Sequence, residues 1–158
     1  MVNRIIHVGI TVTDMDRSVR FYRDILGLKF IGELLMEGPE TDRLFNRENC
    51  RARVAYLNGG DTLSSPPVEL IQFLDTPAEK NVSRLEKTSI SEICFSTPDI
   101  SRLYSHLVEN NVPCLSEPQA FDFTAYGFGK SKALYFKDPD GLILEAIETI
   151  GSRIICNP

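Results

Sequence analysis

The spacing of apolar positions near the N-terminus changes from a strand pattern to a helix pattern. Residues 4–14 (RIIHVGITVTD) alternate in polarity and are rich in Ile and Val, which predicts a strand. Residues 15–26 (MDRSVRFYRDIL) predict a helix, because their apolar positions follow helical spacing at Met15, Val19, Tyr22, Ile25 and Leu26. Thr13 or Asp14 can cap the start of this helix and Gly27 its end, so the sequence itself bounds the helix.

The same order of elements occurs twice in the chain. Three strand-like runs follow the first helix, at 28–36, 51–59 and 68–74. The second half predicts a strand, a helix with Pro98 near its first turn, and three more strands, at 89–99, 100–111, 112–118, 132–141 and 142–149. The sequence therefore predicts an α+β fold of two βαβββ modules, approximately residues 1–80 and 88–150, packed into a single domain over residues 1–158.

The helix caps set the register between the two modules. Asp14 and Asp99 are 85 residues apart, and the same offset places His7 opposite Glu92. The last strands of the modules also correspond, with Glu69 in VELIQF opposite Glu145 in LEAIE. The incomplete curved sheet of one module needs the other module to cover it.

Two longer segments have no clear strand or helix pattern. Residues 36–51 are polar, contain Gly and Pro, and predict a long loop of functional or mobile character. Residues 117–132 place four aromatic side chains among glycines, which predicts either a loop packed on its own aromatic residues or a lid over a substrate.

Composition and charge narrow the classes of function. The 158 residues have a mass of 17.8 kDa, are 42% hydrophobic and 25% charged, and carry a net charge of −5. Such a chain can bury a substantial core, and its acidic balance argues against nucleic acid as a partner. No apolar run is long enough to cross a membrane, and the N-terminal residues lack a signal-peptide pattern, so we expect a cytoplasmic protein.

The four cysteines carry no motif. Cys50, Cys94, Cys114 and Cys156 form no C-x-x-C pair, which argues against a zinc knuckle or a redox motif and predicts free thiols. Cys94 lies in the apolar run EICFS and is expected to be a small buried hydrophobic residue.

Four ionisable side chains fall inside strand patterns: His7, Glu69, Glu92 and Glu145. A carboxylate in apolar surroundings must be hydrogen-bonded, paired with a cation, neutralised or bound to a metal ion. Taken singly, such residues more often face solvent or make an ordinary hydrogen bond. Their equivalent positions in a duplicated sheet instead favour convergence on one divalent cation.

Nearly the whole chain resembles the vicinal oxygen chelate superfamily, which includes glyoxalase I, methylmalonyl-CoA epimerase, extradiol dioxygenases and the bleomycin- and fosfomycin-resistance proteins. The resemblance rests on HVGITVTDMDRSVRFYRDILGLKF from His7, VELIQFLDTP around Glu69, and LYFKDPDGLILEAIE before and through Glu145. It implies paired βαβββ modules that form a cup-shaped sheet with the helices outside. It also implies one divalent metal ion, held by His7, Glu69, Glu145 and the residue at the start of the third repeat-related strand.

That fourth residue is commonly His in metal-bearing members and is Glu92 here. One nitrogen and three carboxylates favour Mn²⁺, Fe²⁺, Co²⁺ or Mg²⁺ and leave Zn²⁺ and Ni²⁺ open. Because three carboxylates carry more charge than a divalent ion, one of them can instead stay off the metal as a base. A third alternative places Glu92 on the outer face of the sheet.

The resemblance implies a metal-dependent epimerase or isomerase that acts on a small substrate with vicinal oxygens through an enolate. Glu145 or Glu92 is the candidate base, and Glu69 is its possible partner on the opposite face of the substrate. A glyoxalase I-like lyase and a metal-free antibiotic-binding protein are the alternatives. A ring-cleaving dioxygenase is disfavoured, since the second histidine, His106, lies in the predicted helix 100–111 and is expected to face solvent.

The sequence indicates the substrate class and the oligomeric state only in general terms. Six basic residues could contact an anionic substrate such as a CoA thioester or simply face solvent: Arg43, Arg47, Arg51, Arg53, Lys130 and Lys132. The habit of this fold to pair modules between chains implies a homodimer.

Overall fold

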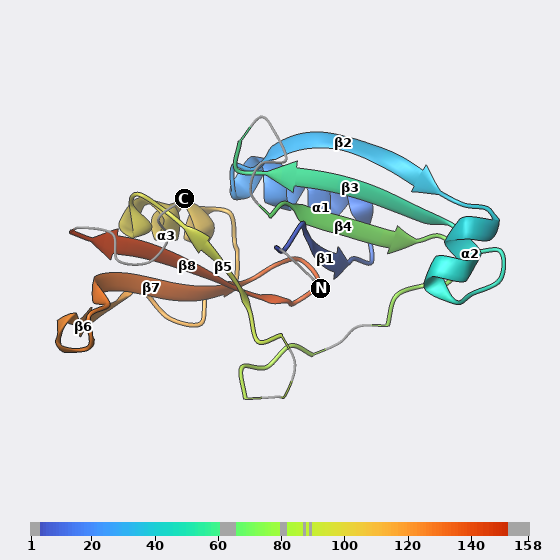
Figure 1. Ribbon diagram of the computed structural model, residues 1–158. Coiled ribbons are helices and arrows are strands. Elements are labelled where there is room, and N and C mark those ends of the chain that lie inside the picture. The colour runs from blue at the N-terminus through green and yellow to red at the C-terminus, as the bar shows by residue number, and fades with distance from the viewer. Residues whose placement is uncertain (1–3, 61–65, 80–81, 87, 89, 152–158) are drawn as a thin grey trace. The chain divides into compact units, whose positions relative to one another are not determined.

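The computed structural model describes residues 4–60, 66–79, 82–86, 88 and 90–151. The contacts within the chain divide it into two compact units, Met1–Lys80 and Asn81–Pro158, called here the N-terminal and C-terminal units. Each unit has a four-stranded sheet of its own (Figure 1). That the two units form a single domain stays a prediction.

The N-terminal unit is built on a mixed sheet in the order β1-β4-β3-β2. Its elements are β1 (Val8–Thr11), α1 (Met15–Arg20), the π-helical turn η1 (Phe21–Ile25), β2 (Lys29–Met36), α2 (Pro39–Phe45), β3 (Ala52–Asn58) and β4 (Val68–Phe73). β1 runs parallel to β4, and the other pairs are antiparallel. The chain leaves β1 through α1 and crosses to β2 at the opposite edge of the sheet, so β1 and β4 are neighbours that are distant in sequence.

The C-terminal unit repeats this topology in the order β5-β8-β7-β6. Its elements are β5 (Ile93–Ser96), α3 (Ile100–Glu109), β6 (Gln119–Phe123), the short 3₁₀ helix η2 (Thr124–Tyr126), β7 (Gly129–Lys137) and β8 (Ile143–Ile150). β5 is parallel to β8, while β8, β7 and β6 pair antiparallel. The predicted α+β class and the repeated strand–helix–strand order are therefore confirmed.

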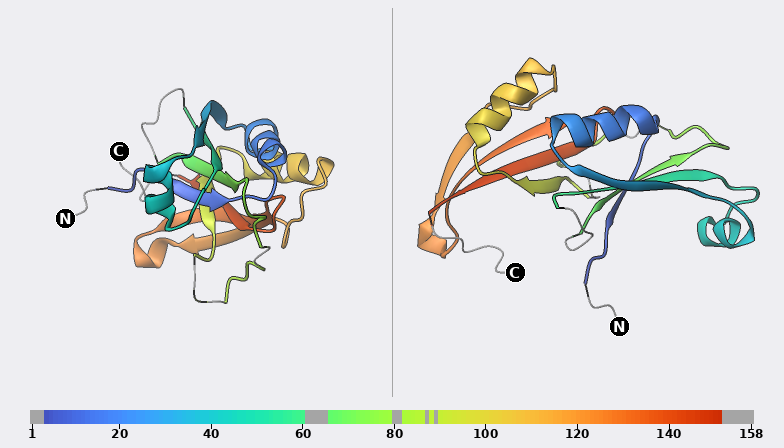
Figure 2. Two further views of the ribbon diagram at one scale, coloured as in Figure 1. Left: turned by 90° about the vertical axis from the view of Figure 1, so that its right-hand side faces the viewer. Right: turned by 90° about the horizontal axis from the view of Figure 1, so that it is seen from above.

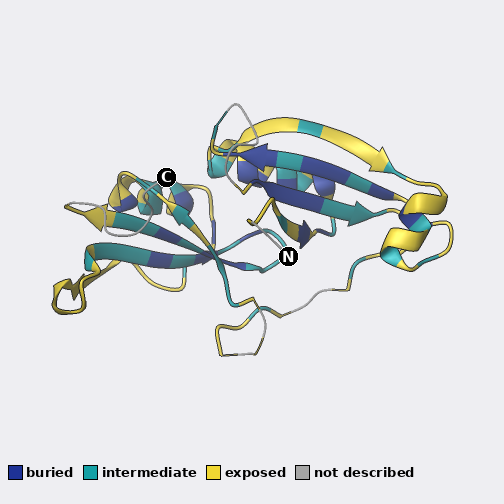
Figure 3. Cartoon of the chain, viewed as in Figure 1, coloured by how far each residue is buried: buried dark blue, intermediate teal, exposed yellow. Residues whose placement is uncertain are grey.

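Each sheet buries the face that its helix covers. α1 contacts β3 and β4, and α3 contacts β7 and β8 (Figure 2). Alternate strand residues that point to the helix are buried: Ile10, Ala55, Leu57, Val68 and Leu70 in one unit, and Leu134, Phe136, Leu144 and Ala146 in the other. The central strands are accordingly the most buried, whereas β2 is largely exposed (Figure 3). Because side chains alternate across a strand, the intervening residues lie on the opposite face, and these include all the strand carboxylates of interest.

The predicted helix boundaries are confirmed in both units. The Asp14 and Asp99 carboxylates each accept a hydrogen bond from the backbone N–H three residues later, at 2.9 Å. These are N-caps in the usual geometry. After η1, Gly27 adopts φ +75°, the left-handed conformation that lets the chain turn into β2.

The prediction of a loop at 36–51 is wrong, because this segment contains the helix α2. Pro39 occupies its first turn, where a missing N–H costs nothing, and Asn46 ends it with φ 51°. The Asp42 carboxylate then accepts hydrogen bonds from the backbone N–H groups of Asn49 and Cys50. These bonds hold the segment that connects α2 to β3.

The predicted strand at 112–118 is also wrong. Only a single bridge between Cys114 and Phe136 forms there, since Pro113 and Pro118 have no N–H to donate to a ladder. The unit's edge strand is β6, which lies inside the segment predicted as a loop or lid. The alternation of Phe121, Asp122 and Phe123 was the strand signal in that segment.

No helix in the described part of the chain is long and apolar enough to cross a membrane.

Candidate functional site

The N-terminal half-site consists of His7, Gly9, Tyr56 and Glu69. Glu69 stands on β4 between Gly9 on β1 and Tyr56 on β3, each in direct register with it. Tyr56 Oη donates a hydrogen bond to Glu69 Oε1 at 2.5 Å, and His7 Nε2 lies 3.2 Å from Glu69 Oε2. The two carboxylate oxygens thus have separate partners.

Burial makes these partners necessary. Glu69 is only 8% exposed, and a carboxylate removed from water must be hydrogen-bonded or paired. The hydrogen bond to Glu69, together with burial, raises the pKa of Tyr56 to about 12, so the phenol stays a proton donor at neutral pH. The His7 side chain is 42% exposed, so one side of the pair remains open to solvent or to a ligand.

Gly9 gives the Glu69 carboxylate room to lie across β1. A Cβ atom at position 9 would approach Glu69 Oε2 to 3.4 Å, close enough to press on the oxygen that faces His7. The His7 and Tyr56 rings meet edge to face, with centroids 6.3 Å apart. The half-site is therefore built around the Glu69 carboxylate of β4, held by Tyr56 of β3 and by His7, which directly precedes β1.

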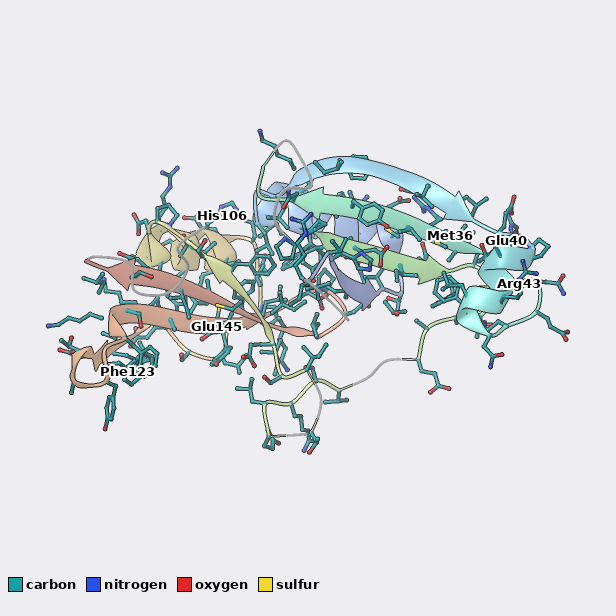
Figure 4. All side chains as sticks on the ribbon, in the orientation of Figure 1. Met36, Glu40, Arg43, His106, Phe123 and Glu145 are labelled. Carbon is teal, nitrogen blue, oxygen red and sulfur yellow. The ribbon has the colours of Figure 1, made fainter. Side chains whose placement is uncertain are left out.

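The C-terminal half-site consists of Glu92, Cys94, Tyr135 and Glu145. Glu145 stands on β8 (Figure 4). It is in register with Cys94 on β5 and Tyr135 on β7, which is the arrangement of Glu69 in the other unit. The Glu145 carboxylate lies close enough to the Tyr135 phenol to raise its pKa. The correspondence of Gly9 with Cys94 keeps the offset of 85 residues, so the pairings confirm the predicted repeat register.

The charges of this half-site all have the same sign. Burial raises the pKa of the Tyr135 phenol, and the charges of Glu145 and Glu92, the hydrogen bond to Glu145 and the nearby Cys94 raise it further. Glu92 therefore lies close enough for its charge to act on Tyr135. No positively charged residue takes the place that His7 has in the N-terminal unit, because Glu92 is its counterpart.

The N-terminal pair has the chemistry and spacing of metal ligands. Two donors about 2.1 Å from one divalent ion, at octahedral to tetrahedral angles, lie roughly 3.0–3.4 Å apart. The observed 3.2 Å between His7 Nε2 and Glu69 Oε2 falls in that interval. Within the described ranges, no three His, Cys, Asp or Glu side chains come together closely enough to hold a metal ion. His7 and Glu69 are brought together, whereas Glu92 and Glu145 are related only through their effect on Tyr135.

Two predictions about side chains outside this ligand set were wrong or incomplete. Cys94 is exposed rather than buried, because the alternation along β5 places it on the same face as Glu145. His106 lies on α3, as predicted, and is partly exposed there, with its carbonyl accepting a hydrogen bond from the Asn110 side chain at 2.8 Å. Cys50 is buried and Cys114 half-buried, while Cys156 lies outside the described residues.

Most of the basic residues considered for an anionic substrate are paired with carboxylates. Four arginines and one lysine make ion pairs: Arg43 with Glu40, Arg47 with Asp75, Arg51 with Glu37, Arg53 with Glu33 and Asp16, and Lys130 with Asp122. Arg53 is held by both of its partners, at 2.6 and 2.8 Å. These pairs leave less positive charge available for a phosphate-bearing substrate than the sequence suggested.

The sequence analysis missed Tyr56 and Tyr135. Both occur as ordinary aromatic positions in strand patterns, so their type gave no signal. The antiparallel pairings of β3 with β4 and β7 with β8 would have placed each directly opposite its glutamate.

The chain matches the model of a known protein family and is similar to curated relatives. Residues 4–146 match the model of the Glyoxalase/Bleomycin resistance protein/Dioxygenase superfamily. The uncharacterized protein YaeR of Escherichia coli is 32% identical and covers 90% of this chain and 93% of its own length. The metallothiol transferase FosB of Staphylococcus epidermidis is 33% identical, over 92% of this chain and 83% of FosB.

Solved structures agree with the fold. A glyoxalase family protein from Bacillus cereus superimposes with a TM-score of 0.82 at 20% identity, covering 96% of this chain and 97% of the other. Glyoxalase I of Leishmania major gives a TM-score of 0.65 at 23% identity, covering 93% and 87%.

Proposed function

Because the chain belongs to the glyoxalase/bleomycin resistance/dioxygenase superfamily, we propose that it is a divalent-metal-dependent enzyme that moves a proton on a small substrate with adjacent oxygens. The observation that supports this most is the pairing of His7 Nε2 with Glu69 Oε2 at 3.2 Å on the buried Glu69 carboxylate. A nitrogen and an oxygen donor at that spacing are suited to one ion.

The ion would be held by His7, Glu69 and Glu145, with Glu92 as a fourth ligand or as a base beside it. Mn²⁺, Fe²⁺, Co²⁺ and Mg²⁺ suit this oxygen-rich set, and Zn²⁺ and Ni²⁺ are the other candidates. A bound divalent ion would polarise the oxygens of the substrate and so acidify the neighbouring C–H bond.

Different residues of the chain would then serve as the fixed metal ligand and as the base that moves the proton. Glu69 already has a partner on each oxygen, which suits a fixed ligand better than a mobile base. Glu92 or Glu145 is the better candidate to take the proton from the α-carbon and return it. Return to the opposite face of the same carbon gives an epimerase, and return to the adjacent carbon gives an isomerase or a glyoxalase I-like lyase.

A second candidate is transfer of a thiol to a small molecule. It is favoured by the metallothiol transferase FosB, which is 33% identical over 92% of this chain. The same half-sites would hold the ion in that case. The two candidates differ in whether a thiol is consumed and in whether a carbon-bound proton exchanges with solvent.

One experiment separates them. The metal-loaded protein and a chelator-treated sample are incubated in D₂O with small 2-oxo acids, hydroxy-ketones and thioesters, and proton NMR follows loss of the α-proton. Metal-dependent exchange without thiol consumption supports proton transfer, whereas metal-dependent consumption of an added thiol supports the second candidate. Binding of a ligand with neither reaction would instead favour the metal-free binding protein.

A homodimer and a cytoplasmic location are part of the proposal. Light scattering of the eluting protein at two concentrations tests the first, since a dimer has twice the mass of the 17.8 kDa chain.

A further inference from the structure

The two half-sites share one feature that the ligand set does not include. In both units a tyrosine on the neighbouring antiparallel strand stands directly opposite the strand glutamate, Tyr56 opposite Glu69 and Tyr135 opposite Glu145. At Glu69 the phenol donates a hydrogen bond to the carboxylate at 2.5 Å, and at Glu145 the carboxylate is close enough to raise the pKa of Tyr135. The residues on the parallel neighbour differ between the units, since Gly9 corresponds to Cys94 and His7 to Glu92. The tyrosine is thus the constant partner of the carboxylate.

The geometry at Glu69 shows what such a tyrosine does. Tyr56 occupies Oε1 at 2.5 Å, while His7 Nε2 faces Oε2 at 3.2 Å. One oxygen is taken by the phenol and the other is directed toward the exposed imidazole. A carboxylate fixed in this way offers one oxygen in one direction rather than two oxygens in several rotamers.

We propose that Tyr56 and Tyr135 are matched positioning residues that hold one oxygen of Glu69 and of Glu145, so that each carboxylate presents a single oxygen to a divalent cation. This inference rests on the proposed function, because it concerns the same ligands. A phenol suits the task since it can donate a hydrogen bond and carries no charge that competes with the cation. Hydrogen-bonding partners of metal ligands fix the orientation of the ligand in the same manner.

The test compares Tyr56→Phe and Tyr135→Phe with the wild-type chain and with Tyr104→Phe. The first two changes remove one phenol oxygen and leave the ring. The matched control removes the same atom from α3, on the other face of the sheet. Apo proteins are titrated with Co²⁺ in competition with a chromophoric chelator, and the visible absorption of bound Co²⁺ reports on ligand geometry.

We expect each site variant to bind Co²⁺ roughly 10- to 100-fold more weakly than wild type and to alter the Co²⁺ absorption bands. Tyr104→Phe should match wild type in both, and all apo proteins should have similar circular dichroism. A structural role alone would lower the melting temperature of the apo protein without moving the spectrum of bound Co²⁺.

A double-mutant cycle keeps the inference testable if one variant is destabilised. Glu69→Asp shortens the carboxylate by one methylene and draws it away from Tyr56, so Tyr56→Phe should add little further loss of affinity in that background. Additive losses would overturn the positioning role.

The outcomes distinguish the two proposals. If wild type binds Co²⁺ and the site variants bind it with the same affinity and spectrum, the positioning role is wrong while the proposed function stands. If the wild-type chain binds no divalent ion, both are wrong.

Discussion

The two half-sites have the same strand pairings around a glutamate but differ in the residue that corresponds to His7. In the N-terminal unit, Glu69 lies between a phenol donor and an imidazole that can carry positive charge. In the C-terminal unit, Glu145 has the phenol of Tyr135, but its other neighbours are Glu92 and the Cys94 thiol. One half-site pairs its glutamate with an imidazole, and the other has a second carboxylate in the corresponding sequence position.

This difference indicates where an external cation is needed. Two carboxylates near one half-buried phenol are stabilised by a counter-charge, a proton or water. The two units thus share the same strand pairings around a glutamate and differ in the charge of one corresponding residue, His7 in one unit and Glu92 in the other. Four predictions test this contrast between the half-sites, in order of decreasing expected effect.

The largest effect is expected from removing one ligand in each half-site. His7→Ala and Glu145→Ala should each weaken metal binding by more than ~100-fold, beyond the loss typical of a residue that only orients a ligand. Neither side chain is part of the apolar core, so both variants should keep wild-type circular dichroism. Metal content after gel filtration measures the loss, and full metal retention in both variants would remove these residues from the ligand set.

Glu92→His makes the C-terminal half-site resemble the N-terminal one. An imidazole in place of a carboxylate should raise the affinity for Zn²⁺ relative to Mg²⁺ by about tenfold, because nitrogen donors suit Zn²⁺ better. Competition between the two ions for the apo protein measures the ratio. An unchanged ratio would place Glu92 off the metal, and a loss of turnover with intact metal binding would identify it as the base.

Cys94 reports on occupation of the C-terminal half-site. Its exposed thiol should react with iodoacetamide roughly tenfold faster than Cys50, which is 1% exposed and whose pKa is raised by burial. Loading with Mn²⁺ should slow alkylation of Cys94, because the thiol is in register with Glu145, and leave Cys114 unchanged. Peptide mass spectrometry resolves the cysteines, and equal rates at Cys94 with and without the ion would argue against a cation at Glu145.

The smallest effect concerns segments in which the two units differ. The N-terminal unit has α2 between β2 and β3, where the C-terminal unit has the short helix η2 between β6 and β7. At the end of β6, the Asp122 carboxylate accepts a hydrogen bond from the backbone N–H of Thr124 and pairs with Lys130. These contacts lower the pKa of Asp122 from 3.8 to about 2. A lowered pKa means that the stabilisation is complete above the unfolded value and is lost as the pH falls through the interval from 3.8 to 2.

Asp122→Asn should therefore flatten the acid dependence of stability slightly in that interval, and only slightly because the carboxylate is exposed. Melting temperatures of both proteins between pH 6 and pH 2 measure the effect. The same acid dependence in both would mean that the Asp122 contacts contribute nothing.

The repeat explains how much of this contrast could be predicted from sequence. The Asp14 and Asp99 caps fixed the register, and the register related His7 to Glu92 and Glu69 to Glu145 before any contact was known. Strand period and cap chemistry are local properties, so they could be seen in one sequence. The family match is consistent with the same residues.

What escaped prediction depends on pairing across strands or on competing local signals. Tyr56 and Tyr135 matter only because antiparallel register puts them opposite a carboxylate. Cys94 was assigned to the core by the apolar character of its neighbours, although the alternation along β5 places it on the other face. The polar composition of residues 36–51 gave no helical pattern, although Pro39 and Asn46 mark the start and end of α2 there.

The central proposal is that the chain binds one divalent ion. Its most direct test is elemental analysis by mass spectrometry of the purified protein, before and after dialysis against a chelator, and after reloading with Mn²⁺, Co²⁺, Ni²⁺ or Zn²⁺. We predict about one ion per chain, lost on chelation and recovered on reloading. Absence of any bound ion after reloading would contradict the account and favour a metal-free ligand-binding member of the same superfamily.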